Sequence, residues 1–507
     1  MLFLFKRNKV VILALMAVLV IVGCQPASRG PEGTPPPKEP PAKTFPRLSP
    51  ETSLALPGGD FTWPSPDDVS ADGNYLALMT NDGDKENLWL YSVSDKEGKL
   101  VYSIPASEVF AGRLVLVTIG WTENNRLVFA RQGTQPDGDY QGKRGLLLLN
   151  ADPESGTVEE VSWLSNPEDY IKQVLLDRQS NNVLVHMGDS LSQLNLNDGS
   201  VKTLRTDLPR YDGLFFLQPS TDKTRFVYQF FEPDKRGIYL LDVATGEETC
   251  LARAGDTFSF SPSWSPDGQY IAFYTAKAKD TSTSEQHNLA DKYDIVEGED
   301  APAPIASTID VINTSGQKIT SLAAPDTKAA MYTWSPDSQH LAFLGAKTKD
   351  TTGDYTEAIF DWQSLYIADL NGNTNKLADI PEGTSFVVIL QVLADRVYYL
   401  TYGPGETNLW LAESGSDPQK LELPTEVSAA GGAFTPVYPL PTWENSLLVS
   451  YIAAERNYYL QVWENQVELL AEDSIDSFVL ATQDQRALLI SPGDNSNNKL
   501  TVFTPKQ

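Results

Sequence analysis

The sequence predicts an all-β fold, a single β-propeller of four-stranded antiparallel blades, and three observations support this prediction. A phrase built on Trp-Ser-Pro-Asp recurs along the chain. Each copy is followed by a short run of β-branched, aromatic and small residues, and then by a second such run and a polar turn. The 507-residue chain carries 34 Gly and 34 Pro and is 41% apolar, so it has the turns and the core material that repeated strands require.

Composition excludes several classes of function. The chain has two Cys and three His, too few for a disulfide-stapled fold of this size or for a Cys/His metal cluster. Its formal charge is −28, from 39 Lys and Arg against 67 Asp and Glu. Binding to a phosphate backbone needs a cationic face, so we expect no nucleic-acid partner. We also expect no cofactor and no bound metal.

Residues 1–23 have the pattern of a lipoprotein signal peptide. A basic start with Lys6 and Arg7 precedes the apolar run Val10–Val22. At about 1.5 Å per residue this run falls short of the ~30 Å hydrocarbon core, so it is not predicted to span a membrane. The sequence Ile-Val-Gly-Cys ending at Cys24 resembles the lipobox of bacterial lipoproteins. The resemblance implies cleavage before Cys24 and lipidation of its thiol; an ordinary secretory signal is the alternative.

Residues 24–50 differ in composition from the rest of the chain. They are rich in Pro, Gly, Lys and Glu and contain almost nothing apolar to bury. Such segments favour extended polyproline II at about 3.1 Å per residue. We expect a linker that tethers the domain at 51–507 to the membrane, outside the cytoplasm in the cell envelope, with a packed arm as the alternative.

Internal repetition dominates the sequence beyond residue 50. The segment from Trp264 to Phe273 aligns without gaps on the segment from Trp334 to Phe343, and the match continues to Thr281 and Thr351. Weaker copies keep the turn cluster and the strand residues after it. They run from Ser70 to Leu78, Trp121 to Phe129, Asp177 to Val185, Pro219 to Tyr228, Ala394 to Leu400, Trp443 to Val449 and Gln483 to Ile490.

The residues of the repeated tetrapeptide Ser-Pro-Asp-Gly have structural roles in a tight turn. Pro pre-sets φ near about −65°, Asp hydrogen-bonds the local backbone, and Gly suits the exit from a tight turn. The turn therefore joins two strands of a hairpin. Further strand segments follow, for example Gly237 to Leu241 and Leu365 to Asp369, and each runs into a polar Gly- or Asp-containing turn. Four antiparallel strands repeated in this way are typical of propeller blades.

The pattern gives nine turn-plus-strand units. Because single propellers usually have about four to eight blades, we predict eight, within a range of seven to nine, with the unit around Asp177 irregular or merged with a neighbour. The last unit, from Phe478 to Pro505, ends after three strands. We expect Ser53 to Leu56 to supply its outer strand, which would remove an exposed sheet edge.

Trp-Ser-Pro-Asp-Gly followed by Ala-Phe resembles the WD40-like (PD40) repeats of TolB-type β-propellers. The pattern covers roughly residues 60 to 507 and is strongest in the units beginning at Trp264 and Trp334. The motif is specific for the fold and nearly silent about function. The resemblance implies a monomeric propeller lipoprotein, held on the membrane by its lipid, that binds an envelope protein or peptide without catalysis.

An enzyme is the alternative. No Gly-x-Ser-x-Gly pentapeptide occurs, so a serine hydrolase is not predicted. We expect His186 to be a satisfied structural histidine, His340 a solvated turn residue, and Cys250 an inert packed thiol. What remains open is a lyase-like or glycosidase-like enzyme, or a carbohydrate-binding protein, with a carboxylate site at the channel mouth.

Two acidic turns offer oxygen ligands of the kind that Ca²⁺ prefers. They are Asp82-Gly83-Asp84 and Asp137-Gly138-Asp139, and neither extends to a full twelve-residue calcium loop. Solvated acidic loops are the simpler interpretation.

Three lengthened segments between second and third strands are the expected partner-binding region: Arg131 to Gly145, Ala278 to Ser307 and Thr348 to Gln363. In propellers of the resembled type this loop lies on a face where partners dock. Long loops in a repeat array are either functional or disordered. The candidate binding residues in these segments are Asp280, His287, Tyr293, Asp294, Asp350, Tyr355 and Trp362.

Overall fold

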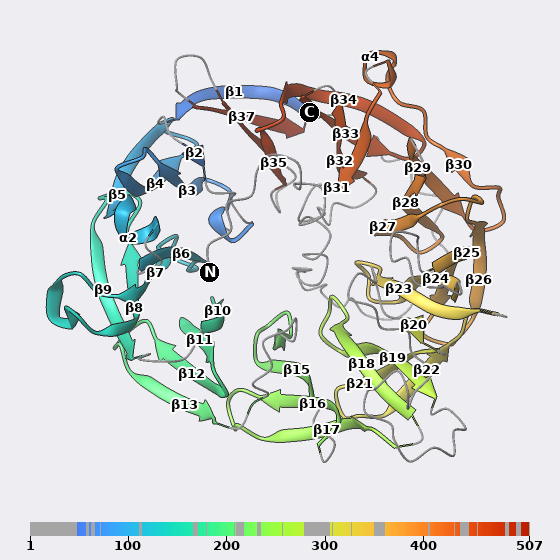
Figure 1. Ribbon diagram of the computed structural model, residues 1–507, viewed down its shortest axis with the longest axis horizontal. Coiled ribbons are helices and arrows are strands. Elements are labelled where there is room, and N and C mark those ends of the chain that lie inside the picture. Colours follow the sequence, from blue (N-terminus) through green and yellow to red (C-terminus); the bar gives the residue numbers. More distant parts are fainter. Residues whose placement is uncertain are drawn as a thin grey trace, which may run out of the picture. The chain divides into compact units, whose positions relative to one another are not determined.

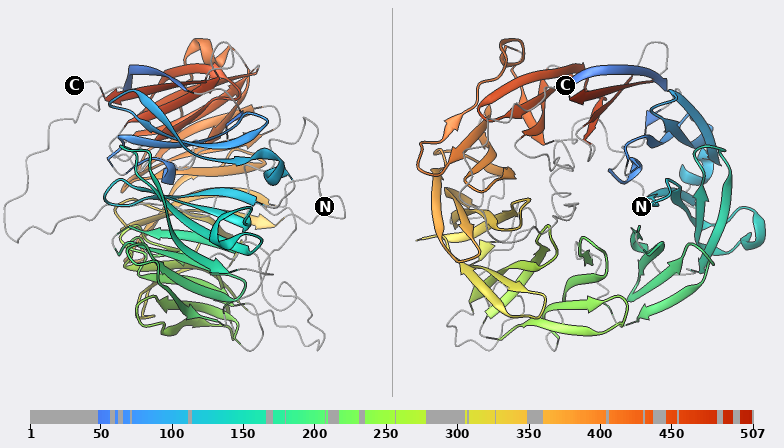
Figure 2. Two further views of the ribbon diagram at one scale, coloured as in Figure 1. Left: turned by 90° about the vertical axis from the view of Figure 1, so that its left-hand side faces the viewer. Right: turned by 180° about the vertical axis from the view of Figure 1, so that it is seen from behind.

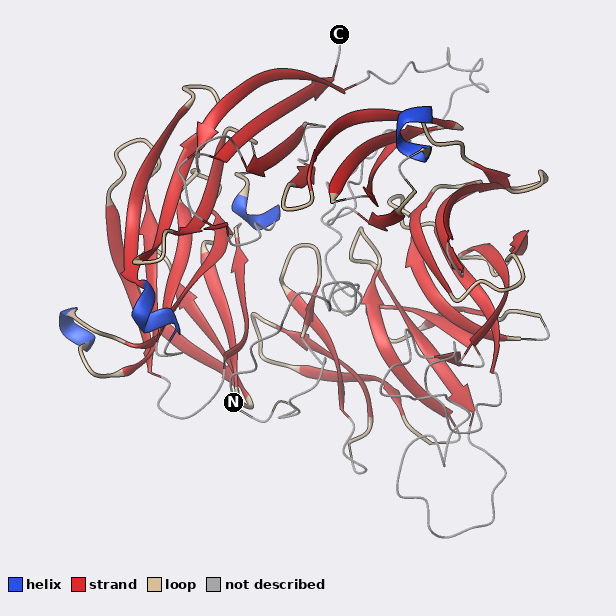
Figure 3. Cartoon of the chain, turned by 45° about the horizontal axis from the view of Figure 1, so that its top comes forward, coloured by secondary structure: helices blue, strands red, loops and turns tan. Residues whose placement is uncertain are grey.

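The computed structural model describes residues 48–505 apart from several gaps. Strands make up almost all of its regular structure, with a few short helices (Figure 3). None of the described helices is long and apolar enough to cross a membrane. The signal peptide and most of the linker, Cys24 included, lie outside the described residues. The gaps are 57–59, 62–65, 71, 111–113, 166–170, 179, 207, 209–216, 231–234, 256, 278–304, 307, 326, 349–359, 404–405, 430, 437–445, 454, 482–485 and 493–497.

The described chain divides into two compact units. Residues 218–422 form one, called here the middle unit, and residues 48–217 with 423–505 form the other, called the terminal unit. Each unit consists of antiparallel sheets of the propeller-blade type, in which sequence order and spatial order of the strands agree almost throughout. The two units are described separately below.

The middle unit contains four blades among its described residues. Their sheet orders are β14-β15-β16-β17, β18-β19-β21-β22, β20-β23-β24-β25-β26 and β27-β28-β29-β30, and consecutive blades follow one another in Figure 1. The strands are β14 (Gln218–Pro219), β15 (Arg225–Phe230), β16 (Gly237–Asp242), β17 (Glu248–Arg253), β18 (Thr257–Trp264), β19 (Tyr270–Lys277), β20 (Ile305–Ala306), β21 (Thr308–Asn313), β22 (Lys318–Leu322), β23 (Lys328–Trp334), β24 (His340–Thr348), β25 (Phe360–Asp369), β26 (Thr374–Asp379), β27 (Phe386–Val392), β28 (Arg396–Gly403), β29 (Glu406–Glu413) and β30 (Gln419–Lys420).

The terminal unit contains five blades among its described residues, with orders β2-β3-β4-β5, β6-β7-β8-β9, β10-β11-β12-β13, β31-β32-β33-β34 and β1-β37-β36-β35. Its elements are β1 (Leu48–Leu56), β2 (Asp60–Phe61), η1 (Pro66–Asp68), β3 (Tyr75–Asn81), β4 (Lys85–Ser92), β5 (Glu97–Pro105), α2 (Ala106–Phe110), β6 (Leu114–Trp121), β7 (Leu127–Thr134), η2 (Gly138–Tyr140), β8 (Arg144–Ala151), β9 (Val158–Ser165), β10 (Ile171–Asp177), β11 (Asn182–Met187), β12 (Ser190–Asn195), β13 (Val201–Arg205), α4 (Thr425–Ser428), β31 (Ala433–Pro436), β32 (Ser446–Ala453), β33 (Arg456–Trp463), β34 (Gln466–Ser474), β35 (Phe478–Ala481), β36 (Ala487–Pro492) and β37 (Asn498–Pro505).

The core lies between neighbouring blades, and the sequence of the second strands reflects this. A central strand has a neighbouring blade on each face, so both sets of alternating side chains are buried and the strand is a continuous apolar run. In β24, Leu341, Phe343 and Leu344 are all fully buried. Phe343 stacks on Tyr366 of the same blade, with ring centroids 5.3 Å apart.

An N-terminal strand completes the last blade, as predicted. β1 pairs with β37 in antiparallel register, with Leu56 opposite Asn498 and Leu48 opposite Pro505. Figure 2 shows the two strands side by side at the outer edge of this blade. The strand is longer than the predicted Ser53 to Leu56, and its first residues fall within the range expected for the linker. β1 leaves β37 without an open outer edge, which would otherwise invite pairing with another chain.

The predicted eight blades are wrong, because the described residues form nine, at the upper end of the predicted range. The unit around Asp177, expected to be irregular or merged, is a complete blade of β10 to β13. Its turn departs from Ser-Pro-Asp-Gly, but the turn works by the same means. Asp177 accepts a hydrogen bond from the Ser180 hydroxyl, and Asn181 takes the left-handed φ of 56°.

Candidate functional site

The repeated turn is a closed hydrogen-bond motif, and its chemistry is structural. The Ser265 hydroxyl donates to Asp267 Oδ1 at 2.7 Å and accepts the backbone N–H of Tyr270 at 2.9 Å. Asp267 Oδ1 also accepts the N–H of Gln269 at 3.0 Å. The same pattern recurs at Ser70, Ser220 and Ser335. Both side chains are therefore occupied by the turn itself, which explains their recurrence without a ligand.

The turns also bond to the neighbouring blade. In the middle unit, the backbone N–H of Asp267 donates to the Ser338 hydroxyl at 2.9 Å. The Thr221 hydroxyl donates to the carbonyl oxygen of Pro266 at 2.6 Å. The Trp264 indole N–H donates to the carbonyl oxygen of Gln218 at 2.9 Å. The turn end of these blades thus joins one blade to the next.

The first lengthened segment, Arg131 to Gly145, is a fixed loop. Its ends are strand residues of β7 and β8, so the connection itself is shorter than predicted. The buried Arg131 guanidinium donates to Gln135, to the Tyr102 hydroxyl at 2.9 Å, and to Asp137 at 2.9 Å. Tyr140 stacks on Trp163 with ring centroids 4.5 Å apart. These contacts hold the loop against its own blade and against β5 of the preceding blade, and leave little of it adaptable to a partner.

The second lengthened segment, Ala278 to Ser307, is described only at Ile305 and Ala306. These two residues form β20, which pairs with Ala330 and Ala329 of β23 in the next blade. That blade therefore has a fifth strand at the edge opposite β26, which the sequence did not predict. The candidate residues of this segment lie outside the described residues: Asp280, His287, Tyr293 and Asp294.

The third segment, Thr348 to Gln363, has its described part in strands. Asp350 and Tyr355 lie outside the described residues. Trp362 lies in β25, is 3% exposed, and donates its indole N–H to the Ser385 carbonyl oxygen at 3.2 Å. It packs in the core cluster around β27 and β28. The expectation that Trp362 offers aromatic contact area is therefore corrected, because β25 begins earlier than the loop was drawn and carries Trp362 into the core.

The acidic turn at Asp82-Gly83-Asp84 is occupied by its own backbone. Asp82 Oδ1 accepts the N–H groups of Asp84 at 3.0 Å and Lys85 at 2.8 Å, and Oδ2 accepts the side-chain amide of Asn87 at 3.0 Å. The bond from the Lys85 N–H and that from Asn87 lower the pKa of Asp82 below its usual value. Within the described ranges, no group of three or more His, Cys, Asp or Glu is arranged to hold a metal ion.

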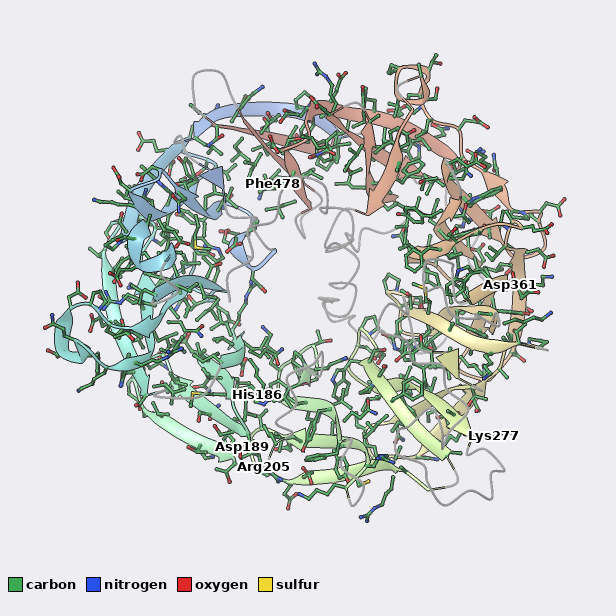
Figure 4. The ribbon with its side chains drawn as sticks, viewed as in Figure 1. His186, Asp189, Arg205, Lys277, Asp361 and Phe478 are labelled. Atoms are coloured by element: carbon green, nitrogen blue, oxygen red, sulfur yellow. The ribbon has the colours of Figure 1, made fainter. Side chains whose placement is uncertain are left out.

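The three residues weighed for acid–base or nucleophilic roles lie in three different strands, β11, β24 and β17. His186 is 2% exposed in β11 (Figure 4), and neither of its ring nitrogens has a hydrogen-bond partner among the described residues. It is buried, as expected of a structural histidine. His340 begins β24, with Nδ1 3.4 Å from Asp337. Cys250, expected to be packed, is exposed on the outer strand β17.

Two features that the sequence did not bring forward involve buried polar groups. Glu86 of β4 is 6% exposed, its Oε2 has no partner in the described structure, and burial raises the pKa of its carboxyl. A pocket of about 510 Å³ lies in the middle unit and is lined largely by polar side chains. Its lining residues are Pro325, Thr327, Lys347, Gln363, Ser364, Tyr366, Thr374, Lys376 and Asp379.

Comparison with known proteins places the chain at the level of fold only. No family model matches the sequence. No curated protein matches it either. Solved structures do: a prolyl endopeptidase at 12% identity and TM-score 0.41, covering 89% of this chain and 55% of that one. The Dos1 propeller follows at 10% identity and TM-score 0.42, covering 90% and 95% of the two chains.

A eukaryotic initiation factor is similar at 10% identity and TM-score 0.48, covering 85% of this chain and 97% of the other. This chain spans little more than half the length of the prolyl endopeptidase it resembles. These likenesses are distant, and no argument about this chain is drawn from them.

Proposed function

We propose that this protein is a TolB-like lipoprotein of the cell envelope, anchored outside the cytoplasm through Cys24, whose monomeric propeller binds a protein or peptide partner and carries out no catalysis. The proposed location in the cell envelope is supported by the signal-peptide pattern of residues 1–23 and by the lipobox-like sequence that ends at Cys24. The Pro-rich stretch after it has the composition of a spacer.

The observation that carries the binding role is the addition of β20 to β23. A two-residue piece of the longest insertion forms an antiparallel ladder with a strand of the next blade, Ile305 opposite Ala330 and Ala306 opposite Ala329. An edge that accepts one short strand offers main-chain N–H and C=O groups to another. β18 and β27 likewise end their sheets, with one edge unpaired by any described strand. Strand addition by an extended peptide is the binding mode that this geometry supports.

The insertion itself supplies the second part of the argument. β20 fixes the end of the Ala278 to Ser307 segment beside the edge of β23. The sequence of this segment is acidic and rich in Pro, and it carries the candidate residues His287, Tyr293 and Asp294. Strand addition gives a peptide main-chain affinity, and aromatic and charged side chains are the groups that add side-chain specificity to it.

The test begins with selection of peptides from a random library on the purified full-length chain in detergent. Dissociation constants of the selected peptides are then measured on the wild type and on two variants. One variant replaces residues 281–300 with a Gly-Ser linker of equal length. The other is Ala306→Pro, which removes a main-chain donor from β20. Ala306→Gly is the matched control.

We expect both variants to weaken peptide binding by about tenfold or more and the control to weaken it little. Turnover of peptides and oligosaccharides by the same preparation is measured in parallel. Selected peptides that bind all variants equally would contradict binding at β20. Turnover without any peptide binding would favour the lyase-like or glycosidase-like alternative.

A further inference from the structure

The pocket of about 510 Å³ in the middle unit is lined mainly by one blade, the sheet formed by β20 and β23 to β26. β24 contributes Lys347, β25 contributes Ser364 and Tyr366, and β26 contributes Lys376 and Asp379. The segment that joins β22 to β23 closes one side with Pro325 and Thr327. The volume is within the range of small-molecule sites, about 300–1,000 Å³.

A glycine in the middle of β24 lets two lining residues of the pocket, Thr327 and Tyr366, pack close to the strand. A Cβ atom at Gly345 would lie 2.6 Å from Thr327 Oγ1, 3.0 Å from Tyr366 Cε2 and 3.2 Å from Ala324 Cβ. Gly345 does not have a left-handed φ, so backbone conformation does not require a glycine here. Because glycine weakens a strand interior, its presence is explained by the close approach of Thr327 and Tyr366 to β24.

The sister blade shows the same position filled. The gap-free repeat alignment that equates Trp264 with Trp334 equates Thr275 with Gly345. Thr275 donates to Asp310 Oδ2 at 3.1 Å, and Asp310 also binds Lys318 at 3.0 Å. In that blade Thr275, Asp310 and Lys318 are therefore hydrogen-bonded to one another. In the blade formed by β20 and β23 to β26, the side chains of Thr327 and Tyr366 lie against Gly345 instead, and they also line the pocket.

Several polar groups that line the pocket have no partner, or only one, among the described residues. The hydroxyl oxygen of Thr327 is buried and has no hydrogen-bond partner among the described atoms. Lys347 is exposed and makes no ion pair with any described residue. Lys376 is paired with Asp379, which also accepts a hydrogen bond from Ser364 at 3.2 Å. Among the described lining residues there are two ammonium groups and one carboxylate, an excess of positive charge in a chain of net charge −28.

We propose that this pocket binds a sugar acid, a polyhydroxylated ligand that carries one carboxylate. The unpaired Lys347 ammonium would bind the carboxylate through charge-assisted hydrogen bonds. The hydroxyls of Thr327, Ser364 and Thr374 and the amide of Gln363 both donate and accept, as a row of ligand hydroxyls requires. This assignment is independent of the peptide-binding role proposed above.

The same lining disfavours two other ligands. Asp379 is an acceptor that would repel the second charge of a phosphate but would accept hydrogen bonds from sugar hydroxyls. A neutral sugar would leave Lys347 without a counter-charge. We therefore expect the pocket to prefer a carboxylated sugar over both.

The test is calorimetric titration of the purified full-length chain with glucuronate, galacturonate and gluconate. Glucose, acetate and inorganic phosphate are the comparators. Lys347→Gln removes the charge, and Gly345→Thr places the sister blade's residue at that position. Lys277→Gln is the matched control, because Lys277 is the repeat equivalent of Lys347 on the neighbouring blade and does not line the pocket (Figure 4).

We expect at least one sugar acid to bind, and Lys347→Gln to weaken it about tenfold or more, with Lys277→Gln unchanged. Gly345→Thr should abolish binding while the unfolding midpoint shows that the variant is folded. The proposal is overturned by no sugar-acid binding to the wild type, by equal binding of phosphate or glucose, or by equal losses in the two lysine variants. Should Gly345→Thr fail to fold, the comparison of the two lysines still decides.

Discussion

At the scale of single residues, recurrence in this chain reports turn chemistry more than function. Ser265 and Asp267 recur because one hydroxyl and one carboxylate close the hairpin turn. Ser338 stands where the sister unit has Gly268, and both have left-handed φ values, 61° and 68°. The residues with functional potential are those that break the repeat, as Gly345 does opposite Thr275.

His186 is the residue whose burial predicts a pH dependence. Burial, with the positive charge of Lys172 as a smaller cause, lowers the pKa of His186 from 6.5 to about 4. Between these two values the unfolded chain binds a proton that the folded chain does not, so the free energy of unfolding falls as pH falls. The contribution is fully present above pH 6.5. At about 1.4 kcal/mol per pH unit the total loss approaches ~3 kcal/mol.

The prediction is that His186→Leu flattens the stability curve between pH 6.5 and about 4 without lowering stability at pH 7.5 by more than about 1 kcal/mol. Urea unfolding at a series of pH values measures this. His340→Gln, at a partly exposed histidine in a different unit, should keep the wild-type slope. A curve for His186→Leu that parallels the wild type would show that other groups cause the acid sensitivity.

At the scale of elements, the repeat predicted strands better than it predicted their number or their ends. All nine sequence units correspond to blades, including the one at Asp177. Eight was chosen because the usual size of propellers outweighed the pattern, although a turn such as that of Asp177 and Ser180 needs only the carboxylate and a hydroxyl. Sequence alone could have identified the ninth blade from this substitution.

The candidate site was predicted less well than the fold. The predicted loop from Thr348 to Gln363 includes Trp362, but β25 starts at Phe360 and buries this side chain. The addition of β20 to β23 depends on a contact between blades, which no local pattern contains. The repeat alignment alone shows that Gly345 replaces Thr275 of the sister blade. The pocket, and the position of Lys347 in its lining, could be seen only in the structure.

β1 is the element with the clearest predicted effect on stability. It buries Leu48 and Leu56 and covers the outer edge of β37. Removing the chain through residue 56 should cost at least about 4 kcal/mol, because the burial of two leucines is lost, and should promote aggregation through the exposed strand. Removal through residue 46 should leave the unfolding midpoint unchanged.

Thermal unfolding and light scattering of the two truncations measure these effects. Adding a synthetic peptide of residues 47–57 to the longer truncation should restore part of the stability. Equal midpoints for both truncations would show that β1 contributes little to the blade that it completes.

At the scale of the whole molecule, charge and anchoring make opposite contributions. A chain of net charge −28 is repelled by an anionic membrane surface, so electrostatics cannot hold it there. The proposed attachment would therefore have to come from acyl chains, and a single chain is marginal. It follows that membrane association, if it rests on the lipobox-like sequence at Cys24, should resist high salt and depend wholly on that thiol.

We predict that metabolic labelling with a radioactive fatty acid marks the wild type and Cys250→Ser but not Cys24→Ser. Cys250 is the control because its thiol is free and exposed, so non-specific acylation of exposed thiols would label it. The wild type should stay with membranes in about 1 M salt, where surface charge interactions are screened within ~3 Å, and Cys24→Ser should be released or remain unprocessed. Release of the wild type by salt would mean that charge interactions hold the protein at the membrane, although the net charge of the chain is negative. Labelling of Cys24→Ser would place the lipid elsewhere and remove the basis for an envelope lipoprotein.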